Sequence, residues 1–146
     1  MAAIILTVGF MGLIQAVTIC SGMMDQARRQ ALAAQILDHE IERLRFKSWA
    51  QIQTLTPPAT IDPQFDQAVA ASGASYTLSS SASYIDPGTN ANTATDTGLR
   101  EITFVLTWVV KTSRRDGSGN PVTFTYTRVN SAYFGKYGLN LTYQRS

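Results

Sequence analysis

Few residues in this chain of 146 could do acid–base or metal chemistry. His39 is the only histidine, and it stands between Asp38 and Glu40 in a segment with helical periodicity. A histidine that acts as a general base needs a positioned nucleophile or a substrate pocket nearby, and no motif in the sequence supplies either. We therefore expect a solvated histidine on a helix surface, with no catalytic residue, no cofactor and no metal site. A hydrolase that uses His39 is the most remote alternative.

The other candidates for chemistry carry weak signals. Cys20 is the only cysteine, so the chain has no internal disulfide and no Cys/His metal cluster; we expect it to serve as a small apolar residue of its helix. Asp86, Asp96 and Asp116 stand in loops of a type that sometimes binds calcium, but they lack the spacing of an EF-hand. The net charge of +2 is too small to indicate a nucleic-acid partner.

The N-terminal segment organises the rest of the chain. Residues 1–24 contain no charged residue, and as a helix they span about 36 Å, enough to cross a hydrocarbon core of ~30 Å. Its glycines and threonines make the segment only moderately apolar, and small residues favour close packing against other helices. We predict a transmembrane or assembly helix whose contact residues are Ile5, Leu6, Gly9, Phe10, Gly12, Leu13 and Ala16.

Residues 25–55 predict an amphipathic continuation of the same helix. Apolar positions recur with a period near 3.6 and form one stripe, whereas most charges lie elsewhere. Glu40 can pair with Arg43, and Glu42 with Arg45, across one helical turn. The helix must end before Pro57-Pro58, because proline lacks the backbone donor. The stripe consists of Ala33, Ile36, Leu37, Ile41, Leu44 and Ser48.

Residues 56–146 predict a small β-rich head. A linker with one helical turn near residues 65–70 comes first, and alternating apolar residues then predict strands at 76–84, 100–111 and 121–129. The last two strands form a hairpin, and the tail after Asn130 adds a strand or coil. The predicted fold class is α+β, a long N-terminal helix packed on a small antiparallel sheet. The predicted head core is Ile102, Phe104, Leu106, Trp108, Phe124 and Tyr126.

The N-terminal third also resembles a known family. AAIILTVGFMGLIQA followed by ARRQALAAQILDHEIERLR is similar to the helix of type IV pilins and type II secretion pseudopilins, most of all minor pilins. The basic leader, the Phe that becomes methylated and the nearby Glu of that family are absent from the sequence. Either the sequence is trimmed at its N-terminus, or its start is misassigned, or the chain is not processed like a pilin, and we assign no processing site. The matching positions are Ile5, Leu6, Gly9, Gly12, Leu13, Ala31, Ala34, Ile36, Glu40, Ile41, Glu42, Arg43, Leu44 and Arg45.

The resemblance implies a structural subunit without catalytic activity. Its partners are other pilin or pseudopilin subunits, which it contacts through the helix, and it passes once through the inner membrane before assembly. Arg28 and Arg29 after the apolar run favour a cytoplasmic head, but the resemblance implies a head in the periplasm or on an extracellular filament, and we follow the resemblance. The alternative is a membrane-anchored monomeric binding module whose ligand or partner site lies on the β head, in the Tyr-rich tail or the 113–120 loop.

Overall fold

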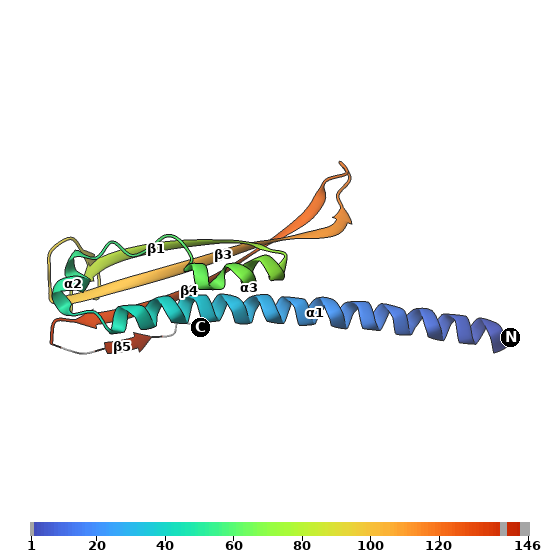
Figure 1. Ribbon diagram of the computed structural model, residues 1–146, viewed down its shortest axis with the longest axis horizontal. Coiled ribbons are helices and arrows are strands. Elements are labelled where there is room, and N and C mark those ends of the chain that lie inside the picture. The colour runs from blue at the N-terminus through green and yellow to red at the C-terminus, as the bar shows by residue number, and fades with distance from the viewer. Residues whose placement is uncertain (1, 138–139, 144–146) are drawn as a thin grey trace.

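One helix, α1 (Ala2–Arg45), forms the axis of the molecule, and a curled antiparallel sheet covers its second half (Figure 1). The computed structural model describes residues 2–137 and 140–143, but not the side chains of residues 2–5, 7, 8, 113 and 140–143. The 44 residues of α1 correspond to about 66 Å. The N-terminal part of this rod extends beyond the sheet (Figure 1). The α+β fold class is therefore as predicted.

The helix ends earlier than the sequence predicted. We expected it to continue to about residue 55, but α1 stops at Arg45 and a separate helix, α2 (Trp49–Thr54), follows. Ser48 has an extended backbone, and its N–H donates to Oε1 of Gln51 at 3.0 Å. A serine followed three residues later by glutamine is the capping-box signal for a helix start. The break turns the chain across the end of the sheet, where Ile52 becomes buried.

The linker holds more helix than a single turn. A 3₁₀ turn, η1 (Pro63–Phe65), leads directly into α3 (Asp66–Ser72). Asp62 caps this segment, because its side chain accepts from the N–H of Gln64 at 3.1 Å. Gly73 ends α3 in the left-handed conformation (φ 65°), which glycine adopts without a steric cost. The prediction of a short helix within the linker is therefore confirmed.

Five antiparallel strands form the sheet in the order β2-β1-β3-β4-β5. The long central strands are β1 (Ser75–Ile85), β3 (Leu99–Arg115) and β4 (Pro121–Gly135). Two short strands, β2 (Asn92–Thr93) and β5 (Asn140–Tyr143), lie at the edges. The three main strands and the hairpin were predicted, although β4 runs six residues beyond the predicted end at residue 129.

The core lies between the inner face of the sheet and the second half of α1. Along β3, Ile102, Phe104, Leu106 and Trp108 are buried, whereas the residues between them are half-buried on the other face. The apolar stripe of α1 packs against them. Both the strand alternation and the helical stripe are therefore confirmed, apart from Ser48, which is exposed. The buried members of the stripe are Ala33, Ile36, Leu37, Ile41 and Leu44.

The two core residues predicted on β4 differ from those on β3. Tyr126 is half-buried and stacks on Trp108, with ring centroids 5.5 Å apart; Tyr76 of β1 stacks on the other side of Trp108 at 6.0 Å. Phe124 is 51% exposed, so its prediction as a core residue is wrong. It pairs with Val110 near the end of the β3–β4 hairpin, and this end bends away from α1 (Figure 1). No helix covers Phe124 there.

Arg100 of β3 fastens α2 to the sheet. Its guanidinium donates to the carbonyl oxygens of Ile52, Gln53 and Leu55 at the C-terminal end of α2, where helix carbonyls lack most of their helical partners. The Ile52 oxygen also accepts from the N–H of Leu55 at 3.3 Å. The group also lies 5.4 Å from the centre of the Tyr84 ring. Arg100 therefore caps the C-terminus of α2 with a positive charge.

Replacing Arg100 by methionine is expected to lower the free energy of unfolding by about 2 kcal/mol, because charged hydrogen bonds to partly buried carbonyl groups are lost. Urea denaturation of the full chain measures this change. Arg128→Met is the matched control, since Arg128 is exposed on the neighbouring strand. A loss of similar size in both variants would contradict the capping role.

Candidate functional site

The N-terminal half of α1 has no packing partner among the described residues. Its large apolar side chains are between 57% and 75% exposed, and they point to all sides of the helix. A helix that is apolar all round is normally covered by other helices or by lipid. This segment is therefore the main candidate for an interaction site. Its exposed large apolar residues are Leu6, Phe10, Met11, Leu13, Ile14, Val17, Ile19, Met23 and Met24.

The predicted contact residues lie on this exposed segment. Leu6, Phe10 and Leu13 are exposed, and so are the small residues Gly9, Gly12 and Ala16. Ile5 lies on α1, but its side chain is outside the described part of the chain. A side chain added at Gly9 or Gly12 would meet no atom of the described chain within 4 Å. The glycines are therefore not required by packing within the subunit.

Gly12 and Ala16 are four residues apart, so they lie on one face of the helix. A pair of small residues with this spacing lets a second helix approach closely. Cys20 is exposed on the same segment, one further turn along. Among the residues that the structure describes, no helix has both the length and the apolarity needed to cross a membrane.

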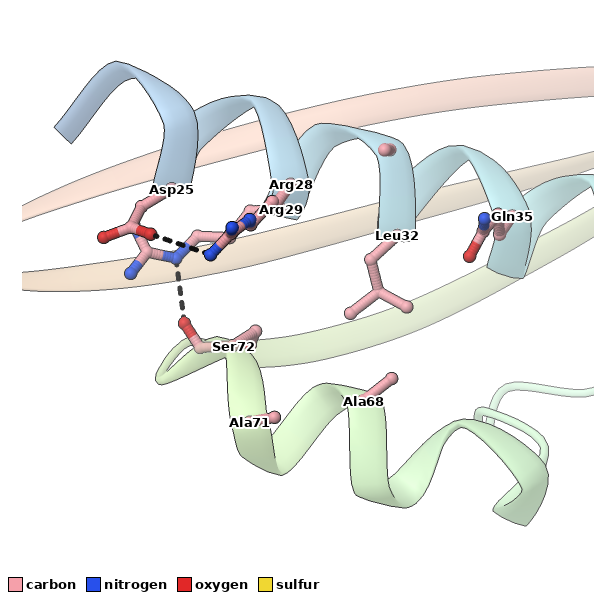
Figure 2. A pocket seen from close by; sticks show the side chains of 9 residues that line it. Asp25, Arg28, Arg29, Leu32, Gln35, Ala68, Ala71 and Ser72 are labelled. Atoms are coloured by element: carbon pink, nitrogen blue, oxygen red, sulfur yellow. Dashed lines mark hydrogen bonds and ion pairs between the residues drawn. The ribbon is translucent and has the colours of Figure 1, made fainter. Parts of the chain in front are cut away.

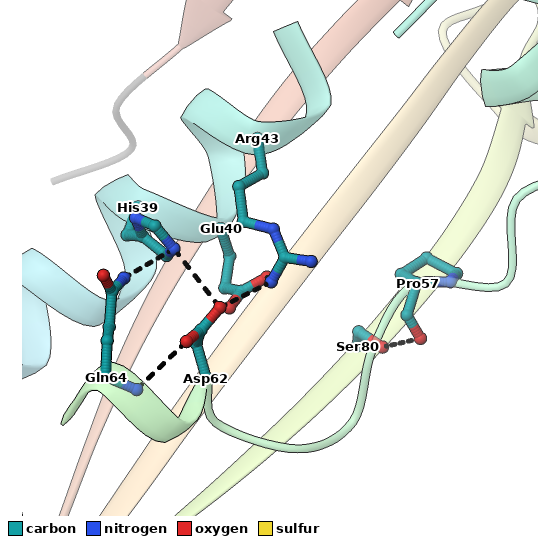
Figure 3. A network of polar contacts seen from close by, with 7 residues as sticks. All are labelled: His39, Glu40, Arg43, Pro57, Asp62, Gln64 and Ser80. Carbon is teal, nitrogen blue, oxygen red and sulfur yellow. Dashed lines mark hydrogen bonds and ion pairs between the residues drawn. The ribbon is translucent and has the colours of Figure 1, made fainter. Parts of the chain in front are cut away.

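A polar cluster forms where α1 meets the linker (Figure 3). Asp62 Oδ2 lies 3.1 Å from Nη1 of Arg43 and 3.6 Å from Nε2 of His39. Glu40, only 1% exposed, stands beside them, with its Oε2 at 3.5 Å from Arg43 Nη1. Nε2 of His39 also contacts the Gln64 amide at 2.7 Å. The cluster therefore brings one imidazole and two carboxylates together on the linker side of α1.

The two carboxylates have opposite electrostatic environments. Burial raises the pKa of Glu40, although the positive charge of Arg43 acts in the other direction. The backbone N–H of Gln64 donates to Asp62 and lowers the pKa of that carboxyl, with Arg43 contributing in the same sense. The environment therefore favours the charged form of Asp62, whereas burial disfavours the charged form of Glu40.

Sequence reasoning missed this cluster. His39 was expected to be a solvated surface residue, but its side chain is 31% exposed and packs edge-on against Phe65, with ring centroids 5.4 Å apart. The Glu40–Arg43 pair was predicted, and it is present. Asp62 arrives from the linker, and no helical spacing relates it to residues 39–43. The only available signal was the turn that Asp62-Pro63 starts.

Among the described residues, the hydrogen bonds and ion pairs of the cluster join His39, Glu40, Arg43, Asp62 and Gln64, and none of these is a serine, threonine or cysteine that could serve the hydrolase alternative as nucleophile. The hydroxyl drawn near the cluster in Figure 3 belongs to Ser80, and it donates to the carbonyl of Pro57 at 3.0 Å. A base also needs a pocket for its substrate, and the groove described next lies elsewhere on α1. The geometry thus offers no observation that favours catalysis by His39.

A groove of about 460 Å³ lies between α1 and α3 (Figure 2). Its polar groups contact one another: Arg28 pairs with Asp25 at 3.8 Å, and Arg29 Nε donates to the carbonyl of Ser72 at 2.9 Å. Arg29 thereby ties α1 to the end of α3. The groove marks the place where α1 leaves the head, and its floor is formed by small and aliphatic side chains such as Leu32 and Ala68.

The loop aspartates stabilise turns. Asp86, Asp96 and Asp116 each accept a hydrogen bond from the backbone N–H two residues later, at 2.8–2.9 Å. This is the Asx-turn role of aspartate. Hydrogen bonding of this type holds the pKa of Asp86 below its usual value. The three residues belong to three separate loops, and they are not among the His, Cys, Asp and Glu residues whose ligand atoms group together in the described part of the chain.

Comparison with known proteins leaves the chain without an assigned family. No protein-family model, no curated protein and no solved structure matches it. Its function is therefore inferred from its residues and their arrangement, above all from the two unlike halves of α1.

Proposed function

We propose that the protein is a structural subunit of a helix-assembled filament, a minor pilin or pseudopilin of a type IV pilus or type II secretion system. One observation carries this proposal. In a single continuous helix, one half packs on the head through its apolar stripe, and the other half is apolar on every side and exposed. The Ile5-Leu6 and Gly9-x-x-Gly12-Leu13 run, which resembles the pilin helix, supports the same conclusion.

In this proposal, the exposed half of α1 packs among the same segments of neighbouring subunits. Burying a Leu, Ile, Phe or Met side chain contributes about 1.5–3 kcal/mol. The nine large apolar side chains exposed in the described part of this segment therefore account for about 14–27 kcal/mol relative to exposure in water. Lipid covers these side chains as well as protein does, so close packing of the helices, rather than this burial, favours assembly over the membrane state. Gly12 and Ala16 let helix backbones approach closely. The head then lies on the outside of the filament.

Before assembly, the subunit resides in the inner membrane through residues 1–24, with its head in the periplasm. A moderately apolar helix suits both environments, because it resides in lipid and later exchanges lipid for helix contacts. The charged residues begin at Asp25, close to where α1 enters the head. The boundary between the apolar and the charged sequence therefore nearly coincides with the boundary between the exposed and the buried half of the helix.

A second candidate function is a membrane-anchored monomeric binding module. The projecting end of the β3–β4 hairpin favours it, since this end carries the exposed Phe124 and reaches away from α1 (Figure 1). The Tyr-rich tail adds Tyr137, which is 90% exposed; the side chain of Tyr143 lies outside the described residues. In this function the hairpin or tail binds the ligand, and α1 serves only as an anchor.

Gly12→Leu is expected to reduce filament formation at least tenfold while leaving the head folded. A leucine side chain at this position keeps the backbones of two neighbouring helices from approaching each other closely. A tenfold loss corresponds to only about 1.4 kcal/mol per contact. The readout is the amount of filament sheared from the native host, together with cross-linked oligomers in its membranes.

Gly117→Leu is the matched control, since an added side chain at Gly117 in the hairpin turn also meets no atom within 4 Å. We expect normal filaments from this variant. Normal filaments from Gly12→Leu would overturn the packing proposal. A phenotype confined to Gly117→Leu would favour the monomeric binding module.

A further inference from the structure

Glu40 is the least compensated charged group that the structure describes. Its side chain is 2% exposed, and Oε1 has no hydrogen-bond partner. Arg43 reaches only Oε2, at 3.5 Å, and the Arg43 side chain is itself 51% exposed. Burying a carboxylate with so little compensation costs several kcal/mol. An uncompensated buried oxygen next to other ligand groups indicates that the cluster has room for a further positive charge.

His39 and Asp62 supply the neighbouring ligand atoms. One nitrogen of His39, one oxygen of Glu40 and one oxygen of Asp62 all lie within 4.8 Å of one another. Asp62 is oriented for this role, since its Oδ1 accepts from the N–H of Gln64 and its Oδ2 faces His39 (Figure 3). An outer hydrogen bond that fixes a ligand carboxylate is a usual feature of metal sites.

We propose that His39, Glu40 and Asp62 bind a divalent transition-metal ion, with Zn²⁺ as the best fit, and that this ion fastens the linker to α1. One imidazole and two carboxylates form a ligand set that zinc accepts, and a fourth position stays open for water. Zinc bonds of about 2.0–2.2 Å place tetrahedral ligands about 3.3–3.5 Å apart. The His39–Asp62 distance of 3.6 Å already matches this spacing, and rotation of side chains closes the remaining gap.

Arg43 lies next to the proposed metal position. Its guanidinium lies 3.1 Å from Asp62 and 3.5 Å from Glu40, so it partly neutralises the two carboxylates. A bound cation repels the guanidinium and makes its contacts unnecessary. The half-exposed Arg43 side chain then moves into solvent, and the Gln64 amide gives up its contact with Nε2 of His39. Zinc affinity is therefore limited by competition with Arg43.

Binding links two segments that lie more than twenty residues apart in the sequence. His39 and Glu40 belong to α1, whereas Asp62 precedes η1 and α3. A metal bound to all three fixes the start of η1 on α1, next to the edge-on contact of His39 with Phe65. The expected consequence is a more protected linker, visible as slower amide hydrogen exchange around residues 60–66 when zinc is present.

The test uses the full chain in detergent, with Cys20→Ser in every sample so that the only thiol does not bind the metal. Zinc is titrated by calorimetry, and the imidazole resonances are followed by ¹⁵N NMR, which is unambiguous because His39 is the only histidine. We expect one zinc ion per chain and a shift of both ring nitrogens. His39→Ala and Asp62→Asn should each weaken binding by more than the roughly 10–100-fold effect typical of outer-shell changes.

Two further variants separate a metal site from general loss of structure. Asp38→Asn is the matched control for Asp62→Asn, because Asp38 is a neighbouring carboxylate that accepts from Asn130 outside the cluster; it should leave zinc affinity unchanged. Arg43→Gln should strengthen zinc binding at least threefold by removing the competing charge. The proposal would be overturned if the chain did not bind zinc or if the His39 resonances did not shift on zinc addition. It would also be overturned if Asp38→Asn lost as much zinc affinity as Asp62→Asn, or if Ca²⁺ bound more tightly than Zn²⁺.

Discussion

Replacing Phe104 by alanine is expected to lower the free energy of unfolding by about 3–5 kcal/mol. Phe104 is 0% exposed and is the largest of the fully buried side chains. It lies at the centre of β3 and packs within the cluster that joins the sheet to α1. Alanine removes most of these contacts and leaves a cavity. The free energy of unfolding of a domain is only about 5–15 kcal/mol, so this single substitution removes a large part of the stability of the head.

Phe124→Ala is the matched control for Phe104→Ala. The two positions carry the same residue type and lie on adjacent strands, but Phe124 is 51% exposed. Its loss should change the free energy of unfolding by less than about 1 kcal/mol. Denaturant unfolding monitored by the fluorescence of Trp49 and Trp108 measures both. Equal losses would mean that the hairpin end is covered, contrary to the observed bend away from α1.

The parts of the fold that were predictable depend on local periodicity. Ile102 to Trp108 alternate along β3 because successive side chains of a strand point to opposite faces. Ile36, Leu37 and Ile41 follow the helical period for the same geometric reason. Each pattern needs only its own segment to be recognised, so the sequence revealed the buried faces of α1 and β3 without knowledge of their partners.

The unpredicted features depend on contacts between distant segments. Ser48 and Gln51 carry a capping-box pattern, but it competed with the continuous apolar stripe that runs from α1 towards Trp49. The break is favoured because it brings Ile52 into the core, where it is 1% exposed. Phe124 illustrates the opposite case. Apolar and polar side chains alternate along its strand as expected, but the strand extends beyond the part of the sheet that packs on α1, so Phe124 stays exposed. In both cases the arrangement of other elements decides the outcome.

The same distinction explains the candidate sites. The exposed half of α1 was predictable as an interaction segment, because the absence of charge from residues 1–24 is a property of the sequence alone. The burial of Glu40 was not, since Asp38, Glu42 and Arg43 beside it are charged residues that suit a solvated helix face. Only the packing of η1 against α1 brings Asp62 to His39 and covers Glu40. When the residues of a site come from a helix and from a distant loop, no regular sequence spacing relates them, so the sequence alone does not indicate the site.

Phe10→Asp is expected to abolish assembly of the subunit while leaving its head folded. Phe10 is 65% exposed and precedes Leu32, the first buried apolar residue of α1, by 22 residues, or about six helical turns, so the isolated subunit loses no core contact. In an assembled filament the new carboxylate is surrounded by apolar helices, and an unpaired buried charge of this type costs several kcal/mol in every subunit. We expect no detectable filament and no cross-linked oligomer in the native host.

The same substitution at Phe124 completes this test. Phe124→Asp introduces an identical charge at a comparably exposed position of the head, so it controls for charge and for the loss of an exposed aromatic ring. Filaments should form normally in Phe124→Asp, and both purified variants should unfold at the same denaturant concentration as the parent chain. Because an anchor also tolerates a charge poorly, membrane fractionation accompanies the assay. Loss of filaments with membrane association retained assigns the effect to helix packing, whereas filaments from Phe10→Asp would contradict an assembly role for the exposed half of α1.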